Sequence, residues 1–316
     1  MGAYLCVTID CECDKGEGWR LKQPLSFAGI TAGIVDHLQP LFAAYGAKPT
    51  YLLSPEVLAD PASVACLTTL RGSAEFGTHL HGEFIEPGAF VPDCTSAFQC
   101  NYPPRIERLK LARLTAMFRA AFGYQPRSFR AGRFGIGPHS LKFLAELGYT
   151  VDSSVSPLKD WSKQGAPAAS FRLAPTQPYW PLTSVPELVA NEPGDILEVP
   201  VTILPSRYAN LPLIGDRFEP RWLRPTHGSS ESLVQVARDE LARAKSGPVV
   251  LNCMFHNVEI MPGLSPYAKT AADADAILGR LEALLAFARD EGIAVVGLAD
   301  IGEIFAPDIA RERAFA

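Results

Sequence analysis

Several features that define other classes of protein are missing from this sequence. No apolar run approaches the roughly 18 residues that a membrane-spanning helix needs, and no basic segment followed by an apolar stretch opens the chain. Lysine and arginine form no cluster, and the formal net charge of −5 argues against a nucleic-acid-binding surface. Internal repeats and low-complexity tracts are also missing. These absences favour a globular protein, which we expect in the cytoplasm.

Cysteine is present, but not in the arrangement of a structural zinc site. The chain has seven cysteines, an odd number that fits reduced thiols in the cytoplasm. Cys11 and Cys13 are two residues apart, and no second cysteine pair follows at the spacing that such a site needs. We therefore expect no zinc site built from four cysteine or histidine ligands of this type.

Strand-like and helix-like stretches alternate along the chain. Apolar runs predict strands at 3–9, 48–54, 74–81, 128–132, 149–155, 195–204, 248–256 and 293–301. Amphipathic stretches with capping residues predict helices at 27–46, 60–72, 103–123, 138–148, 229–247 and 270–292. Such alternation builds parallel βαβ units, so we predict one α/β domain over 1–316, a distorted (β/α) barrel of seven or eight parallel strands. The long loops 82–103 and 156–228 are expected to cover or wall its active site.

Charged and imidazole side chains collect where the predicted strands end. In "VTIDCECD" (7–14) an apolar strand runs into acids, whose burial would cost several kcal/mol without compensation by a cation or a shared proton. The carboxyl ends of barrel strands converge on the active site. The residues at these ends are Asp10, Glu12, His79, His81, Glu83, Arg130, Arg133, Asp152, His256 and Glu259.

Side-chain alternation selects candidate metal ligands from this set. Successive side chains of a strand point to opposite faces, so Asp10 and Glu12 share a face while Cys11 points the other way. His79 and His81 also share a face. Carboxylates with two imidazoles suit Zn²⁺ and tolerate other divalent ions. We predict one divalent metal ion, with zinc as its expected identity, bound by Glu12, His79 and His81.

Two alternatives remain beside this ligand set. If the chain turns helical after His79, Glu83 becomes its neighbour four residues on and replaces His81 as a ligand. The acids could also form only structural ion pairs with Arg130 and Arg133. The joint occurrence of such residues at four strand ends disfavours that purely structural interpretation.

Five short motifs follow one another along the chain: "TIDCE" (8–12), "EFGTHLHGE" (75–83), "SFRAGRFG" (128–135), "LGYTVDSSV" (147–155) and "MFHNVEIMPGLSPY" (254–267). In this order they resemble the motifs of the polysaccharide deacetylase superfamily (NodB-homology domain, carbohydrate esterase family 4), and the resemblance covers roughly residues 4 to 300. The second and fifth look most like a cytoplasmic-type bacterial branch associated with surface-polysaccharide biosynthesis. The resemblance implies a distorted β/α barrel with a divalent metal, usually zinc.

The resemblance also implies catalytic roles. Asp10 matches the catalytic base, and Arg130 matches the residue that orients it. His79 matches the first histidine ligand of the metal. His256 matches the acid that protonates the leaving amine, and Asp152 matches the carboxylate that supports His256.

Further residues are expected around the substrate. Backbone amides near Gly132 and Arg133 would hold the oxyanion, and the Arg133 side chain is expected to bind substrate. Trp161 is expected either to stack on a sugar ring or to anchor the local packing of its loop. Glu259 is expected either to contact the substrate or to tune His256.

This chain departs from the family pattern at two positions. Cys11 stands where the second carboxylate follows the base, so the ligand role passes to Glu12, with a Cys11 thiolate as an alternative. Glu83 stands where the second histidine lies four residues after the first, so His81 is the nearer imidazole.

The expected function is hydrolysis of an N-acyl amide, most simply an N-acetyl group on an amino sugar or polysaccharide precursor, by a metal-dependent deacetylase. A small non-sugar amide as substrate, a catalytically inactive sugar-binding barrel and a glycosidase using Asp10 and Asp152 are the alternatives. The expected partner is a carbohydrate or small amide, with no nucleic acid and no transmembrane segment. The oligomeric state is left open.

Overall fold

The structure of the chain is a computed structural model that describes residues 2–21, 23–88, 98–209, 218–244 and 247–306. Within these residues no helix combines the length and apolar character needed to cross a membrane. Parts of both predicted long loops, 89–97 and 210–217, lie outside the described residues.

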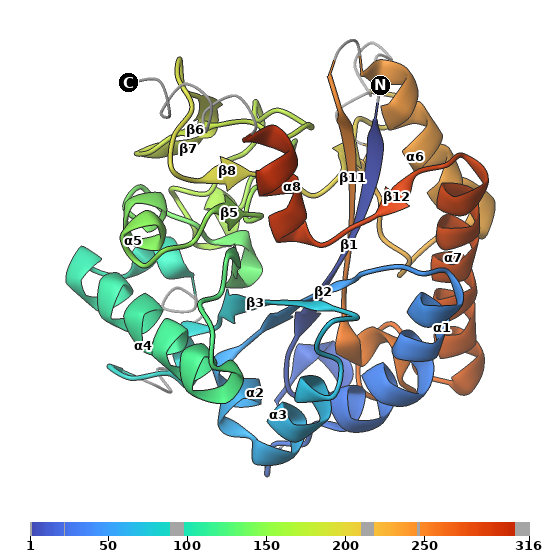
Figure 1. Cartoon of the computed structure of the whole chain (residues 1–316), viewed down its shortest axis with the longest axis horizontal. Coiled ribbons are helices and arrows are strands. Elements are labelled where there is room, and N and C mark those ends of the chain that lie inside the picture. The colour runs from blue at the N-terminus through green and yellow to red at the C-terminus, as the bar shows by residue number, and fades with distance from the viewer. Residues whose placement is uncertain (1, 22, 89–97, 210–217, 245–246, 307–316) are drawn as a thin grey trace.

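A curled parallel sheet forms the centre of the molecule (Figure 1). In the described chain its strands run in the order β11–β1–β2–β3–β4–β5–β8, and β12 pairs with the first half of β1. The strands are β1 Ala3–Cys11, β2 Thr50–Leu53, β3 Glu75–Leu80, β4 Ser128–Ala131, β5 Val151–Asp152, β8 Leu197–Glu198, β11 Val249–His256 and β12 Ala294–Val295. All pairings between them are parallel. The predicted α/β class and distorted barrel are confirmed.

The register of the sheet brings distant site residues together. β1 and β11 pair along eight residues, ending with Asp10 opposite His256. β3 and β4 pair so that His79 lies opposite Arg130. Strands buried on both faces are expected to read as continuous apolar runs, and β1 is buried along most of its length. The apolar strands therefore fix the register, and the register places the polar residues at their carboxyl ends.

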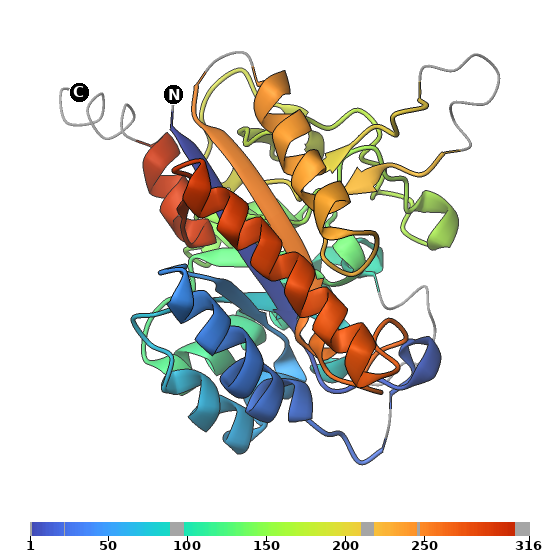
Figure 2. The same ribbon diagram turned by 90° about the vertical axis from the view of Figure 1, so that its right-hand side faces the viewer.

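Helices cover the outside of the sheet (Figures 1 and 2). They are α1 Gln39–Ala44, α2 Pro55–Ala59, α3 Pro61–Thr68, α4 Pro104–Phe122, α5 Ser140–Glu146, α6 Ser230–Arg243, α7 Ala271–Asp290 and α8 Leu298–Phe305. α6 packs on β11 and α7 packs on β12. The Asp60 side chain caps α3 by accepting from the Ser63 amide at 2.8 Å, and Gly123 ends α4 with φ of +75°.

The helix predicted at 27–46 is found in two parts. The first winds as a π-helix (η2, Gly29–Leu38) and continues into α1. Asp14 accepts the amides of Ala28 and Gly29 at 2.8 and 2.9 Å, which places an acid at the start of this helix. A Cβ on Gly29 would lie 2.8 Å from Asn257 Nδ2, so only glycine allows this approach.

Two predicted strands are corrected by the structure. Only Ala294–Val295 of the stretch 293–301 is a strand, and α8 follows because Asp300 accepts the Gly297 amide at 2.9 Å and caps the helix. The stretch 195–204 is broken into β8 and β9 (Ile203–Leu204). After β8 the chain crosses towards β11, where the Thr202 amide donates to the Asn252 carbonyl at 3.0 Å. This irregular contact spans the seam between β8 and β11.

Two short antiparallel pairs lie within the predicted long loop 156–228, and of their four strands only β9 falls in a predicted strand. β6 (Pro181–Leu182) pairs with β7 (Val185–Val189), and β9 pairs with β10 (Arg221–Trp222). Trp222 of the second pair packs against Phe134, with ring centroids 5.9 Å apart.

Candidate metal centre and active site

A cavity of about 400 Å³ opens at the carboxyl ends of the strands. This size is typical of a small-molecule site. Its lining residues are Asp10, Glu12, Lys15, Trp19, Leu21, His79, His81, Glu83, Phe84, Arg133, Phe134, Trp161, Arg224, His256 and Tyr267. Most of the predicted site residues therefore share one cavity.

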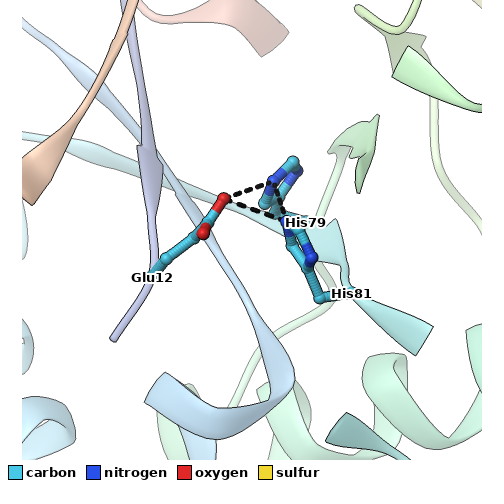
Figure 3. A group of neighbouring side chains, drawn as sticks. All are labelled: Glu12, His79 and His81. Carbon is cyan, nitrogen blue, oxygen red and sulfur yellow. Dashed lines mark hydrogen bonds and ion pairs between the residues drawn. The ribbon is translucent and has the colours of Figure 1, made fainter. Parts of the chain in front are cut away.

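Glu12, His79 and His81 form a compact cluster of possible metal ligands (Figure 3). Glu12 Oε1 lies 2.9 Å from His81 Nε2 and 3.4 Å from His79 Nε2, and the two nitrogens are 3.1 Å apart. Zinc bound tetrahedrally at about 2.0–2.1 Å needs ligand atoms about 3.3 Å apart. The three residues fit a divalent ion.

The second nitrogen of each imidazole is already hydrogen-bonded. His79 Nδ1 lies 3.0 Å from the Arg130 carbonyl, and His81 Nδ1 lies 3.2 Å from Glu83 Oε1. Metal-binding histidines commonly show such contacts, which fix the ring and leave the other nitrogen for the ion. Glu83 Oε1 also pairs with Arg133 at 2.8 Å. The alternative ligand Glu83 is thus placed behind His81, on the side away from the ligand cluster.

The carboxylates of Glu12 and Glu83 favour the protonated form of His81. Burial alone would lower the pKa of His81, but Glu12 and Glu83 raise it to about 10. Burial alone would raise the pKa of Glu12, yet His81 and Lys15 hold it well below its usual value. Because a histidine ligand must be neutral, binding of a metal ion would release the His81 proton.

Cys11, the other alternative ligand, points into the hydrophobic core. Its sulfur lies 3.6 Å from the Ile9 carbonyl oxygen, and the side chain is buried among apolar residues. Burial, followed by the charges of Asp10 and Glu12, raises the pKa of this thiol well above its usual value. The structure therefore favours the carboxylate of Glu12 over a Cys11 thiolate.

Asp10 is held as a buried carboxylate by Arg130. Arg130 Nη1 donates to Asp10 Oδ1 at 2.7 Å, and the arginine is itself fully buried. The guanidinium also donates to Thr8 Oγ1 at 2.8 Å and to the Ser153 carbonyl at 2.9 Å. Burial alone would raise the pKa of Asp10, but Arg130 and then His79 lower it below the ordinary value. Asp10 is therefore ionised and able to accept a proton.

Glu259, and not Asp152, is the carboxylate that contacts the His256 ring. His256 Nδ1 lies 2.7 Å from Glu259 Oε1, while Glu259 also accepts from Arg224 and Thr226. The charge of Arg224, with that of His256, outweighs burial and lowers the pKa of Glu259 to about 2. The Glu259 side chain is buried, and it is not among the described residues that line the cavity. Of its two expected roles, the contact with His256 is the one found.

Asp152 lies away from His256. Among the described residues its carboxylate accepts from Ser154 Oγ at 2.6 Å and faces Glu198, its partner across β5 and β8. Burial raises the pKa of both acids, and the charge of Asp152 raises that of Glu198 further, while the hydrogen bond from Glu198 opposes the rise at Asp152. Asp152 therefore belongs to a pair of buried acids whose ionisation is disfavoured by burial.

The turn after β4 is strained and close to the ligand cluster. Arg133 and Phe134 both adopt left-handed backbone conformations, with φ of +54° and +56°, which cost non-glycine residues of order 1–3 kcal/mol. A Cβ on Gly132 would lie 2.5 Å from the Leu80 carbonyl and 3.3 Å from His81 Nε2. Glycine lets this turn approach the histidine, and both strained side chains line the cavity.

Aromatic side chains form two walls of the cavity. On one side Trp161 stacks on Phe134 with centroids 5.9 Å apart and an interplanar angle of 10°. On the other, Trp19 packs over His256 at 4.9 Å and against Tyr267 at 5.5 Å. Trp161 was expected at the site.

Sequence reasoning missed several cavity residues. They are Lys15, Trp19, Phe134, Arg224 and Tyr267. Lys15 carried a usable signal, since it is the first cation after the acids of 10–14, whereas Arg224 lies in an irregular segment without periodicity.

Solved structures with the same fold support the assignment of the barrel. A protein from Parabacteroides distasonis, provisionally described as a glycoside hydrolase/deacetylase, matches 96% of this chain and 71% of its own with a TM-score of 0.66 and 11% identity. A Pseudomonas aeruginosa protein, provisionally described as a polysaccharide deacetylase, matches 96% and 90% with a TM-score of 0.57 and 15% identity. PuuE allantoinase matches the same shares with a TM-score of 0.57 and 14% identity.

At these identities the likeness defines the fold and leaves the activity to be argued from the site. The chain has the fold of the polysaccharide deacetylases, as its five motifs predicted. The sequence itself matches no family model, and a search of the curated proteins found no match.

Proposed function

We propose that this protein is a metal-dependent hydrolase that removes an N-acyl group, most simply an N-acetyl group, from an amino sugar or polysaccharide precursor. The observation that carries the proposal is the meeting of three groups in one cavity. A ligand cluster (Glu12, His79 and His81), a buried ionised acid (Asp10) and an oriented imidazole (His256) all line it.

The three clustered residues would hold one divalent ion, with zinc as the proposed identity. When bound, such an ion polarises the acyl carbonyl and makes water a better nucleophile. Glu12 offers one carboxylate oxygen, and His79 and His81 each offer the nitrogen that is not used by a neighbouring acceptor.

Proton transfer is assigned to two residues on adjacent strands. Asp10 accepts the proton of the attacking water, because Arg130 keeps it ionised within the buried site. His256 donates a proton to the departing amine, and Glu259 holds its ring by a contact at Nδ1. Asp10 and His256 are partners across β1 and β11, so base and acid lie side by side.

The walls of the cavity suit a sugar. The face of Trp161, braced by Phe134, is proposed to pack on a pyranose ring, and the Arg133 side chain at the same rim would bind its polar substituents. Backbone amides of the turn at Gly132 and Arg133 are proposed to stabilise the oxyanion of the tetrahedral intermediate.

A second candidate is an amidohydrolase acting on a small non-sugar amide. The shared fold with PuuE allantoinase, at a TM-score of 0.57, motivates this alternative. The same base, acid and ligand cluster would serve either substrate.

The test is acetate release from a panel of N-acetylated amino sugars, measured with and without added zinc after treatment with a chelator. We expect release only in the zinc-loaded protein. Hydrolysis of a cyclic or small non-sugar amide without any acetate release would select the second candidate. Equal turnover by the chelated and loaded protein would contradict the metal-dependent mechanism.

A further inference from the structure

We propose that Lys15 competes with the metal ion for Glu12 and keeps the ligand cluster formed before the ion binds. This inference rests on the metal site of the proposed function and assigns a new positioning residue to it. Neither the motif resemblance nor the expected ligand set includes Lys15.

The ion pair between Lys15 and Glu12 is short and buried. Lys15 Nζ lies 3.0 Å from Glu12 Oε2, and the exposed fractions of the two side chains are 7% and 5%. The ammonium also lies 3.5 Å from Cys13 Sγ and 5.6 Å from the centre of the Phe84 ring. Glu12 is the acid that forms an ion pair with this ammonium, so Lys15 interacts directly with a candidate metal ligand.

The backbone of Lys15 is fixed from two sides. Its amide donates to the Leu264 carbonyl at 3.0 Å, and an antiparallel bridge joins it to Leu21. The side chain therefore approaches Glu12 from an anchored segment rather than from a free loop end.

Glu12 divides its two oxygens between different partners. Oε1 faces His81 at 2.9 Å and His79 at 3.4 Å, and Oε2 faces Lys15. A divalent ion held by the imidazole nitrogens and Oε1 would share one small carboxylate with an ammonium. Two cations on one buried carboxylate repel each other, and each lowers the attraction that the other experiences.

Without the ion, the same lysine has a stabilising role. A buried carboxylate without a partner is costly, and Lys15 supplies the neutralising charge on the oxygen that the histidines leave unused. Lys15 would thus hold Glu12 in place in the metal-free protein and weaken the binding of the ion that follows.

If Lys15 merely oriented Glu12, its removal would weaken metal binding instead of strengthening it. Partners that merely orient a metal ligand strengthen binding, and their removal typically weakens metal affinity by about 10–100-fold. A competing cation weakens binding, so its removal strengthens it. The direction of the change in affinity separates the two roles.

The experiment measures the zinc dissociation constant of the metal-stripped protein by competition with a chromophoric chelator. We expect Lys15→Met to bind zinc at least about tenfold more tightly than the wild type. The substitution removes the repulsion between the Lys15 ammonium and a zinc ion that would share the Glu12 carboxylate. Lys15→Gln should change in the same direction, and Lys15→Arg, which keeps the charge, should stay within about threefold of the wild type.

A remote lysine supplies the matched control. Lys48 pairs with Asp300 at 2.9 Å outside the cavity, and Lys48→Met should leave the zinc affinity unchanged. Thermal unfolding gives a second readout, because tighter binding enlarges the increase in Tm on adding zinc. If the two neutral variants fold only when zinc is present while the wild type folds without it, Lys15 is shown to keep the site formed, which also supports the proposal.

Two results would overturn it. If the wild type binds zinc and the neutral variants bind equally or more weakly, Lys15 is an orienting residue and only this inference fails. If the wild type binds no divalent ion, the metal site of the proposed function fails as well.

Discussion

Two pairs of buried acids lie in the same barrel and differ in whether a cation accompanies them. Asp10 and Glu12 each have a basic partner, Arg130 and Lys15 respectively, at 2.7 and 3.0 Å. Asp152 and Glu198 face each other, and among the described residues neither forms an ion pair.

The presence or absence of a paired cation decides whether the acids of each pair ionise readily. The first pair has lowered pKa values despite full burial, so its members are ionised and available for proton transfer and metal binding. The second pair has raised pKa values because burial dominates and, among the described residues, no cation forms an ion pair with either acid. Motif position gives Asp152 a catalytic role, whereas the structure places it beside Ser154 and Glu198, outside the cavity lining.

The largest effect on activity is expected from replacing Asp10, the proposed base in the pair of Asp10 and Glu12. Asp10→Asn is nearly isosteric but cannot accept a proton, so we expect kcat/KM to fall by about 10²–10⁴-fold with zinc still bound. The measurement is steady-state acetate release together with the metal content. Asp14→Asn is the matched control: Asp14 caps a helix outside the cavity, asparagine can still accept one of the two helix amides, and activity should be retained. A variant at position 10 with more than about a third of the activity would assign the base elsewhere, with Glu12 first.

Glu83 tests whether a carboxylate near the cluster is a ligand or a support. As the partner of His81 Nδ1, Glu83→Gln should weaken zinc binding by about 10-fold, and by no more than 100-fold, while one ion per chain still binds at saturation. Chelator competition measures this. Complete loss of the metal from this variant would make Glu83 a ligand in place of His81.

Glu259 tests how the proposed acid His256 is supported. Glu259 Oε1 lies 2.7 Å from His256 Nδ1, and its pKa of about 2 keeps it ionised beside the ring. Glu259→Gln keeps the size of the side chain but removes the carboxylate, so we expect kcat/KM to fall by about tenfold. Steady-state acetate release measures this, and an unchanged kcat/KM would show that Glu259 does not support His256.

The smallest effect on activity is expected from the uncompensated pair. Asp152→Asn should leave kcat/KM within about threefold of the wild type, since Asp152 contacts Ser154 and Glu198 and lies outside the cavity. A larger fall, with the variant still folded, would restore the catalytic role that the motif implied.

The same variant should change how stability depends on pH. A carboxyl group whose folded pKa is raised stabilises the fold below its unfolded pKa of about 4, and this contribution is lost as the pH rises through the folded value. The free energy of unfolding of Asp152→Asn should thus improve relative to the wild type between pH 4.5 and 8. Denaturant titrations at both pH values measure the difference, and a constant difference would mean that Asp152 is ionised in the folded protein.

The regular part of the molecule could be predicted from the sequence. Apolar strands such as β1 and β11 have strong periodic signals, and the two-residue alternation correctly grouped His79 with His81 and directed Cys11 into the core. Parallel topology then required the strand ends to converge.

The missed features depend on contacts that no local pattern encodes. Trp19 reaches His256 because the segment after β1 folds back over the cavity with a left-handed residue, φ of +60°. Arg224 comes from the irregular seam between β8 and β11. Glu259 had a local signal, the spacing of a capping box with His256, but its choice over Asp152 depends on the three-dimensional placement of both acids.

The central claim is that Glu12, His79 and His81 hold one divalent ion, and elemental analysis of purified protein tests it most directly. We predict one zinc or other divalent ion per wild-type chain and none in the His79→Ala/His81→Ala double variant, with circular dichroism confirming that the variant is folded. Full metal occupancy in the folded double variant, or a wild type that binds no ion at saturating zinc, would contradict the account.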